Sequence, residues 1–263
     1  MADRHRPGAV TLHGGGEFLG GDDPTLAAML AAVRPAVRPA RIVIVPTAAA
    51  RARPDLAAAQ GTEAFRRVAA ERGVLAQVEE LPIVDAESAA DATLVASIDR
   101  ADVIYLPGGD PDLIPAIPPE PPAWAAMLEA WHGGAVLAGA SAGAMALAAS
   151  CWTPGGLVAG LGVVPGLVVA PHADATSWAR NVTRFGPQVP AHLGILGIGE
   201  RTALLGRPGE AWRVVGAGEV RWQAAGATRP VIARHGATIR LDVPGESAVG
   251  ALSRCSGVPP RHR

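Results

Sequence analysis

The chain has 263 residues, 49% of them hydrophobic, and a formal net charge of −1 at pH 7. This length and hydrophobicity are enough for a buried core, and the near-neutral charge excludes the basic surface that nucleic-acid or anionic-membrane binding needs. All 23 lysine-or-arginine positions are arginine, so chemistry that requires a lysine, such as a Schiff base, a phosphate-loop lysine or a serine–lysine dyad, is excluded.

In chain order, short apolar runs alternate with helical patterns. Strands are predicted at 9–15, 41–47, 76–83, 102–109 and 134–140, and helices at 23–33, 55–72, 91–100, 121–132 and 142–149. Several apolar runs lack a period-two alternation, which is typical of strands buried on both faces of a parallel sheet. A proline-rich surface loop is predicted at 115–124.

After Leu157 the pattern changes to short β-rich segments separated by glycine. Residues 211–222 and 230–243 are predicted to form antiparallel hairpins added to the sheet. The expected fold is a single α/β domain over 1–263, a three-layer sandwich with a mostly parallel central sheet. Flexible tails are expected at about 1–8 and 254–263.

The N-terminal segment has no apolar stretch of the kind that a signal peptide contains, and the longest apolar run, 135–149, is too short and too interrupted to span a bilayer. We therefore predict a cytoplasmic protein with no membrane partner. Cys151 and Cys255 are interpreted as free buried thiols, with a redox role as the alternative. Cys151 is expected within the helix after residue 141.

Ser141 lies in the segment Gly139-Ala-Ser-Ala-Gly143, directly after a predicted strand. This G-x-S-x-G spacing between a strand and a helix is the pattern of a nucleophile elbow. In an open α/β sheet, ligands bind at the carboxyl ends of the strands, where Ser141 is expected. The alternative is a helix whose small residues only allow close packing, and the strand-to-helix context favours the nucleophile.

A serine nucleophile needs a general base and an acid that orients it. His172 follows an apolar strand and is expected at the same sheet edge as Ser141, whereas His192 precedes a strand and is expected at the opposite edge. His13 is interpreted as a wall of the pocket. These choices favour His172 as the base.

Two acids are candidates for the orienting role. Glu200 lies between two apolar runs and is preferred, and Asp174 is the alternative. The order Ser141, His172, Glu200 differs from that of α/β-hydrolases, which run serine, acid, histidine. That fold would need Ser141, Asp174 and His192, which the position of His192 disfavours.

The sequence resembles the dipeptidase E and cyanophycinase family of serine peptidases, which have the class I glutamine amidotransferase-like (flavodoxin-like) fold. The matching segments occur in order over most of residues 9–222. They are HGGGEF at 13–18, LPGGDP at 106–111, ASAGAM at 140–145, APH at 170–172, GIGERTAL at 197–204 and WRVVGAGEV at 212–220.

The resemblance implies Ser141 as the nucleophile, His172 as the general base and Glu200 as the orienting acid. It implies an oxyanion hole built from the N–H groups of Ala142 and of Gly109 or its neighbour. A glycine pair after a strand suits this role, because its backbone N–H groups reach a developing negative charge without side chains intervening.

The region after the histidine departs from the family pattern. The family often has an aromatic residue where this chain has Ala173, and cyanophycinases usually have closely spaced arginines there. Here Arg180 and Arg184 come later, four residues apart on one helical face. They are predicted to bind a substrate carboxylate, with a solvated face as the alternative. Asp110 is predicted to bind a substrate amine or guanidinium, with a turn role as the alternative.

The expected activity is that of a serine hydrolase that cleaves an amide next to aspartate through an acyl-enzyme. The substrate would be an aspartyl or β-aspartyl dipeptide or a cyanophycin-like polymer. An esterase or amidase on the same fold and a catalytically inactive binding protein are the alternatives. No cofactor or metal is predicted, because His172 and Asp174 lack a third ligand at a recognisable spacing. The expected partner is a small peptide substrate, and a homodimer is the assembly considered.

Overall fold

The structure, a computed structural model, describes residues 6–33, 38–117 and 122–241. The expected tail at 254–263 therefore lies outside the described residues. Residues 6–8, expected to be a flexible tail, are anchored instead. The Gly8 N–H donates to the Trp131 carbonyl (2.7 Å), and Trp131 Nε1–H donates to the Gly8 carbonyl (2.9 Å).

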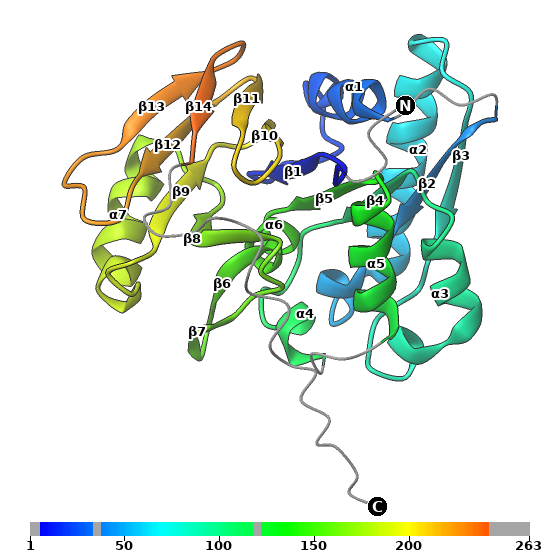
Figure 1. Cartoon of the computed structure of the whole chain (residues 1–263), viewed down its shortest axis with the longest axis horizontal. Coiled ribbons are helices and arrows are strands. Elements are labelled where there is room, and N and C mark those ends of the chain that lie inside the picture. The colour runs from blue at the N-terminus through cyan, green and yellow to red at the C-terminus, as the bar shows by residue number, and fades with distance from the viewer. Residues whose placement is uncertain (1–5, 34–37, 118–121, 242–263) are drawn as a thin grey trace, which may run out of the picture.

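The larger sheet contains all five strands predicted before Ser141 (Figure 1). Its strands β1, β5, β4, β2 and β3 run parallel, and β10, β11 and β14 add to the β1 side in antiparallel pairs. The strand order is β14 (Thr238–Arg240), β11 (Ala211–Gly216), β10 (Thr202–Gly206), β1 (Val10–His13), β5 (Val136–Ala140), β4 (Val103–Leu106), β2 (Ala40–Ile44) and β3 (Ala76–Glu80). The predicted mostly parallel α/β sheet is confirmed.

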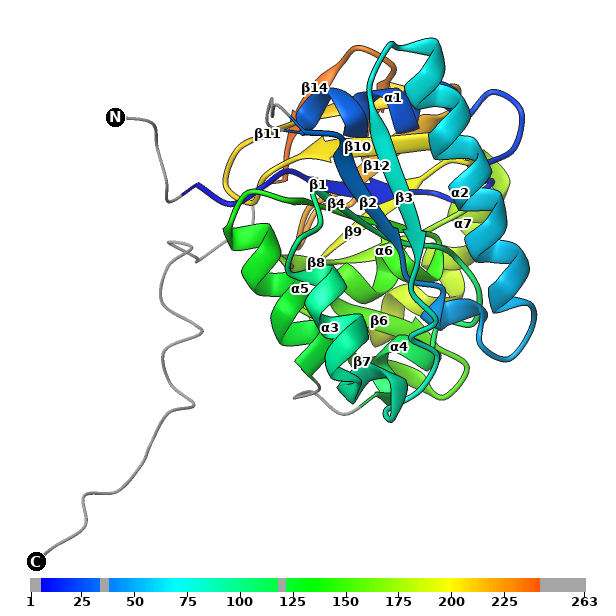
Figure 2. The same ribbon diagram turned by 90° about the vertical axis from the view of Figure 1, so that its right-hand side faces the viewer.

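Helices cover both faces of this sheet, which is why its central strands are apolar on both sides (Figure 2). Alternate residues of β2 point to opposite faces: Ile44 packs in the core with Phe65, and Val43 packs in the core with Trp124. One face carries α1 (Asp23–Ala32) and α2 (Pro54–Glu71), and the other carries α3 (Ala92–Ile98) and α5 (Pro122–His132).

A second sheet follows the helix after Ser141. Its strand order is β13 (Val231–Arg234), β12 (Glu219–Gln223), β9 (Gly194–Ile198), β8 (Val164–Ala170), β6 (Ala148–Thr153) and β7 (Gly156–Ala159). Strands β6, β8 and β9 run parallel. One buried cluster contains residues of both sheets, for example Ile104 and Val168, which favours the predicted single domain.

The predicted C-terminal hairpins are wrong in their pairing. Strand β11 pairs with β10 and β14 in the larger sheet, whereas β12 pairs with β9 and β13 in the second sheet. The chain crosses between the sheets at Gly216, whose φ is 116° and where a Cβ would lie 2.1 Å from the Arg201 carbonyl oxygen. The alternation of apolar and polar residues and the glycine turns predict strands, but they do not identify each strand's partner.

Two local predictions also need correction. The helix after Ser141, α6, ends at Leu147, because residues 148–153 pair as strand β6 with β7 and β8. Cys151 therefore lies in a strand, where burial raises the pKa of its thiol to about 12. In the proline-rich segment, Leu113–Ala116 forms the short helix α4, and residues 118–121 lie outside the described part.

The remaining elements are the helix α7 (Ala175–Phe185) and three short 3-10 turns at Thr47–Ala49, Ser88–Ala90 and Gly186–Gln188. Among the described residues, no helix has the length and apolar character needed to cross a membrane.

Candidate active site

Ser141 stands at the turn between β5 and α6, with φ 47° and ψ −111°. Its N–H donates to the His13 carbonyl (2.9 Å), and its own carbonyl accepts the Met145 N–H (2.9 Å). A positive φ is unfavourable for a residue with a Cβ, so the turn persists because its surroundings hold it. Such a strand-to-helix turn presents the hydroxyl above the sheet edge.

The glycines on either side of Ser141 are sterically required. A Cβ on Gly139 would lie 2.4 Å from the Gly143 carbonyl carbon, and a Cβ on Gly143 would lie 2.2 Å from the Leu106 carbonyl oxygen. The small residues therefore allow close packing and the sharp turn at once, so the two interpretations of this segment are compatible.

His172 follows β8 and points its ring at Ser141. The Ser141 Oγ and His172 Nε2 atoms lie 2.9 Å apart. Its backbone is also strained, with φ 60°, and is held by the His172 N–H donating to the Gly14 carbonyl (2.9 Å). The hydroxyl of Ser177 donates to the His172 carbonyl from the first turn of α7.

Glu200, in the turn between β9 and β10, contacts the other ring nitrogen. Its Oε1 lies 3.1 Å from His172 Nδ1. The alternative acid, Asp174, instead accepts the N–H groups of Thr176 and Ser177 (both 2.8 Å) and caps α7. These hydrogen bonds, first those from Ser177, lower the pKa of Asp174. The contacts therefore favour Glu200 over Asp174 as the partner of the imidazole.

The glycine loop after β1 supports the histidine ring. Gly15 has φ 110°, and a Cβ on it would lie 2.2 Å from His172 Cε1, so only glycine fits there. The Gly15 carbonyl accepts the Arg201 N–H (2.7 Å), which joins this loop to the turn that carries Glu200. The His172 side chain is 48% exposed and that of Glu200 55%, so the imidazole–carboxylate pair is open to solvent.

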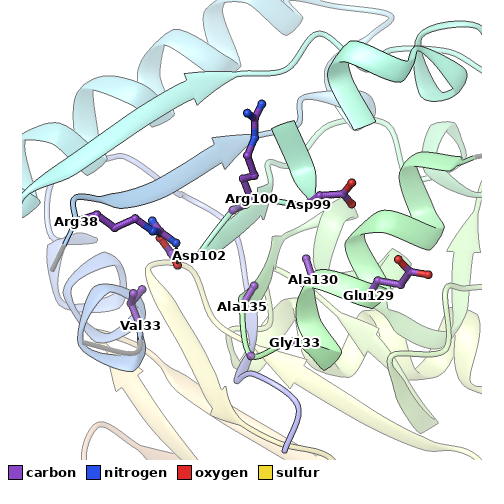
Figure 3. Close-up of a pocket in the computed structure, with 11 residues that line it drawn as sticks. Val33, Arg38, Asp99, Arg100, Asp102, Glu129, Ala130, Gly133 and Ala135 are labelled. Atoms are coloured by element: carbon purple, nitrogen blue, oxygen red, sulfur yellow. Dashed lines mark hydrogen bonds and ion pairs between the residues drawn. The ribbon is translucent and has the colours of Figure 1, made fainter. Parts of the chain in front are cut away.

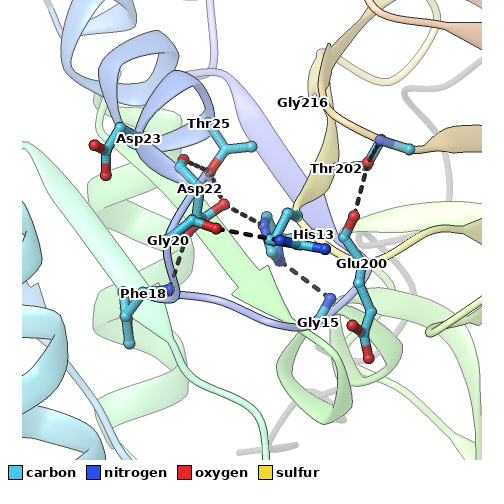
Figure 4. A network of polar contacts seen from close by, with 12 residues as sticks. His13, Gly15, Phe18, Gly20, Asp22, Asp23, Thr25, Glu200, Thr202 and Gly216 are labelled. Atoms are coloured by element: carbon cyan, nitrogen blue, oxygen red, sulfur yellow. Dashed lines mark hydrogen bonds and ion pairs between the residues drawn. The ribbon is translucent and has the colours of Figure 1, made fainter.

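His13 was predicted to form a wall of the pocket, but it lies inside the protein. It is fully buried; its Nδ1 accepts the Gly15 N–H (3.1 Å), so its proton is on Nε2 and is donated to Asp22 Oδ1 (2.8 Å) (Figure 4). Asp22 also accepts the Phe18 N–H (3.0 Å). This network fixes the loop between β1 and α1. His192 lies exposed before β9, at the opposite edge from His172 as expected.

The predicted oxyanion donors are Ala142, which follows Ser141, and Gly109, which follows the glycine that lies against Ser141. Ala142 begins α6, and the described backbone hydrogen bonds give no acceptor to its N–H or to that of Gly109. Gly109 has φ 153°, and a Cβ on it would lie 2.1 Å from the Ala48 carbonyl oxygen. The neighbouring Gly108 N–H is already donated to Glu17 Oε1 (2.7 Å). Of the two glycines, Gly109 is therefore the available donor.

A cavity of about 360 Å³ adjoins this glycine pair and is lined in part by Asp110, Arg51 and Leu56. Asp110 is not a free carboxylate, because Arg51 Nη1 lies 2.7 Å from its Oδ2 and 2.9 Å from Asp112 Oδ1. A substrate cation at Asp110 would have to compete with Arg51, which weakens the predicted role of Asp110.

Arg180 and Arg184 are both exposed on α7, where their four-residue spacing puts them on one face of the helix. Arg184 stacks over the Phe185 ring, 5.0 Å from its centroid. The positive charge of Arg180 contributes, after the hydrogen bonds from Ser177 and Thr176, to the lowered pKa of Asp174. No ion pair engages either arginine within the described ranges.

A larger cavity, about 410 Å³, lies at the opposite edge of the larger sheet (Figure 3). It is lined in part by Asp102 and Ala135, which immediately precede β4 and β5, and by Arg38. None of the predicted site residues lines it. In the part of the chain that the structure describes, no group of three His, Cys, Asp or Glu side chains is placed to hold a metal ion.

Two contributors were not predicted as site residues from the sequence. Gly15 backs the imidazole, and Glu17 holds Gly108 beside Ser141. The only signal for either was their place in the HGGGEF segment, whose spatial neighbours are distant in sequence.

The family model that matches the sequence is that of peptidase family S51, over residues 10–213. The chain belongs to peptidase family S51. The resemblance inferred from the motifs is thus confirmed, and membership makes the protein a peptidase of a serine-type family.

The fold comparison agrees. The chain is similar to the crystal structure of a peptidase from an acI-B1 Actinobacterium, with a TM-score of 0.70 and 26% identity over 90% of this chain and 98% of the other. A peptidase E-type protein of Listeria monocytogenes EGD-e has the same fold, with a TM-score of 0.54 and 16% identity over 81% of this chain and 98% of the other. No curated protein matches the sequence significantly.

Proposed function

We propose that this S51 peptidase is a serine hydrolase with a catalytic triad of Ser141, His172 and Glu200. The observation that carries the proposal is the continuous hydrogen-bonded series from Ser141 Oγ to His172 Nε2 (2.9 Å) and from His172 Nδ1 to Glu200 Oε1 (3.1 Å). A carboxylate can only accept, so Glu200 selects the tautomer with its proton on Nδ1 and leaves Nε2 free to accept the serine proton.

The reaction then follows from the positions of these groups. His172 takes the proton of Ser141 as Oγ attacks the scissile carbonyl carbon. The N–H groups of Gly109 and Ala142 stabilise the negative charge on the carbonyl oxygen; one such donor typically lowers the barrier by about 2.7–4 kcal/mol. His172 next donates its proton to the leaving amine, and a water molecule activated by His172 hydrolyses the acyl-enzyme.

For the substrate, we propose an amide bond next to aspartate in a short peptide or a cyanophycin-like polymer. The support is the arginine pair on α7, which begins three residues after His172 and carries Arg180 and Arg184 without ion-pair partners in the described residues. Two arginines on one face suit a carboxylate, because guanidinium groups match its geometry.

The proposal is tested by combining an active-site probe with a substrate panel. A fluorophosphonate probe should label Ser141, and α- or β-aspartyl dipeptides should be hydrolysed faster than alanyl dipeptides and p-nitrophenyl esters. Each α-aspartyl dipeptide is matched by an alanyl dipeptide that differs from it only in the side chain next to the scissile bond. Labelling with preferential ester hydrolysis would indicate an esterase, and a protein with neither labelling nor turnover would contradict the proposed triad.

A further inference from the structure

Glu17 places a carboxylate beside the serine without belonging to the triad. Its Oε1 accepts the Gly108 N–H at 2.7 Å. A Cβ on Gly108 would lie 2.7 Å from that oxygen and 3.0 Å from Ser141 Cβ, so the carboxylate and the serine flank the same glycine. The mechanism proposed above gives Glu17 no task, although the glycine that it contacts lies against Ser141.

The charge of Glu17 is not neutralised by the protein. In the described ranges no arginine or histidine forms an ion pair with it, and its hydrogen bond to the Gly108 N–H uses only Oε1. The residue is half-buried. Partial burial of a carboxylate without a cation costs free energy. A cationic group of a ligand would supply the missing opposite charge.

The loop holds Glu17 in place. The next residue, Phe18, has φ 65°, donates its N–H to the buried Asp22 (3.0 Å), and packs its ring 5.2 Å from that of Tyr105. In the part of the chain described here, the only other non-glycine residues with positive φ are Ser141, His172 and Arg201, which follows Glu200. Glu17 thus directly precedes a strained residue that its surroundings hold in place, and strain of this kind clusters at functional sites.

We propose that Glu17 binds the free α-ammonium group of the residue that acylates Ser141, so that the peptidase acts on substrates with an unblocked amino terminus. This inference rests on the proposed function. In an aminoacyl group the amine is one carbon from the scissile carbonyl, and in a β-aspartyl group it is two carbons away. This short separation matches the position of the Glu17 carboxylate, which contacts Gly108 next to the proposed oxyanion donor Gly109. Arg180 and Arg184 would then bind the carboxylate of the same residue.

The experiment compares each aspartyl dipeptide with its N-acetylated form. Wild type should hydrolyse the free-amine form with a kcat/KM about 100-fold higher. Glu17→Gln keeps an oxygen for the Gly108 N–H but removes the charge, so this ratio should fall at least about 10-fold, mainly through loss on the free-amine substrate. Glu17→Asp should fall between the two. The control Glu63→Gln, an exposed residue on α2, should keep the wild-type ratio.

A second readout does not depend on the aspartyl preference. Diphenyl α-aminophosphonates with a free or an acetylated amine should label Ser141 with the same rate ratio, and Glu17→Gln should reduce it. An equal loss of rate on the free-amine and acetylated members of each pair would mean that Glu17 only positions the glycine loop. An absence of amine preference in wild type would also overturn the inference while leaving the triad intact. Absence of any labelling would overturn the triad itself.

Discussion

The two edges of the larger sheet are built from the same strands but differ in backbone strain. Around the carboxyl ends of β1 and β5 lie all four non-glycine residues with positive φ in the described ranges: Phe18, Ser141, His172 and Arg201. The amino edge has the larger cavity, about 410 Å³, yet its non-glycine lining residues have ordinary φ values. There Arg38 and Asp102 form a two-point ion pair at 2.7 and 2.9 Å.

The difference teaches that cavity size is a poor guide to the site in this protein. At the amino edge the charges of Arg38 and Asp102 neutralise each other, which leaves little for a ligand. At the carboxyl edge the backbone holds unfavourable conformations so that a hydroxyl, an imidazole and carboxylates converge. Strain of this kind persists only where the surrounding structure imposes it. The following predictions test whether the strained edge is the functional one.

The largest effect is expected from Ser141→Ala. Removing the hydroxyl should lower kcat on the aspartyl substrate by about 10⁴-fold or more, because the acyl-enzyme can no longer form. The circular dichroism spectrum and Tm should stay close to those of wild type. Ser150→Ala, in β6, is the matched control and should keep full activity. Turnover near the wild-type rate in the Ser141 variant would place the reaction elsewhere.

Glu200→Gln should have the next largest effect and separates the two candidate acids. An amide can donate to Nδ1 and favour the wrong tautomer, so kcat should fall by about 10³- to 10⁴-fold. Asp174→Ala should instead lower Tm by about 2–4 °C through loss of the helix cap, with kcat changed less than 10-fold. If the Asp174 variant lost the activity and the Glu200 variant kept it, the acid would have been assigned to the wrong residue.

Gly15→Ala tests the strained loop directly. The new Cβ would lie 2.2 Å from His172 Cε1, so the ring should shift and kcat should fall by about 10²-fold. Gly73→Ala is the control: its φ is also positive, 65°, but a Cβ there meets open space and should leave kcat unchanged. Equal kinetics for both variants would show that Gly15 does not position the imidazole.

The smallest effect is expected from the double variant Arg180→Ala and Arg184→Ala. Loss of both guanidinium groups should raise KM for aspartyl dipeptides by about 10-fold with little change in kcat, since these side chains would bind substrate rather than act on the scissile bond. Alanyl dipeptides should be unaffected. The exposed Arg229→Ala variant serves as control. An unchanged KM for the aspartyl substrate would indicate that the pair is only a solvated helix face.

Sequence patterns pointed to most residues of the candidate site, because several of them directly follow strands. Ser141 and His172 each come directly after an apolar strand, and parallel strands bring their carboxyl ends to one edge. Glu200 was found by its place between two apolar runs. Glu17 was given no role, because its partner Gly108 is 91 residues away and nothing in the local pattern records that contact. The strand partners of β11 to β14 were missed for the same reason.

By itself, the sequence determined the peptidase family, the mostly parallel sheet and the serine at the turn after β5, since periodicity and glycine spacing are local properties of the chain. Only the tertiary structure decided that Asp174 caps a helix while Glu200 meets the imidazole, that the Gly108 N–H is donated to Glu17, and that the last four strands divide between two sheets. These outcomes depend on distances between residues far apart along the chain, which no local pattern specifies.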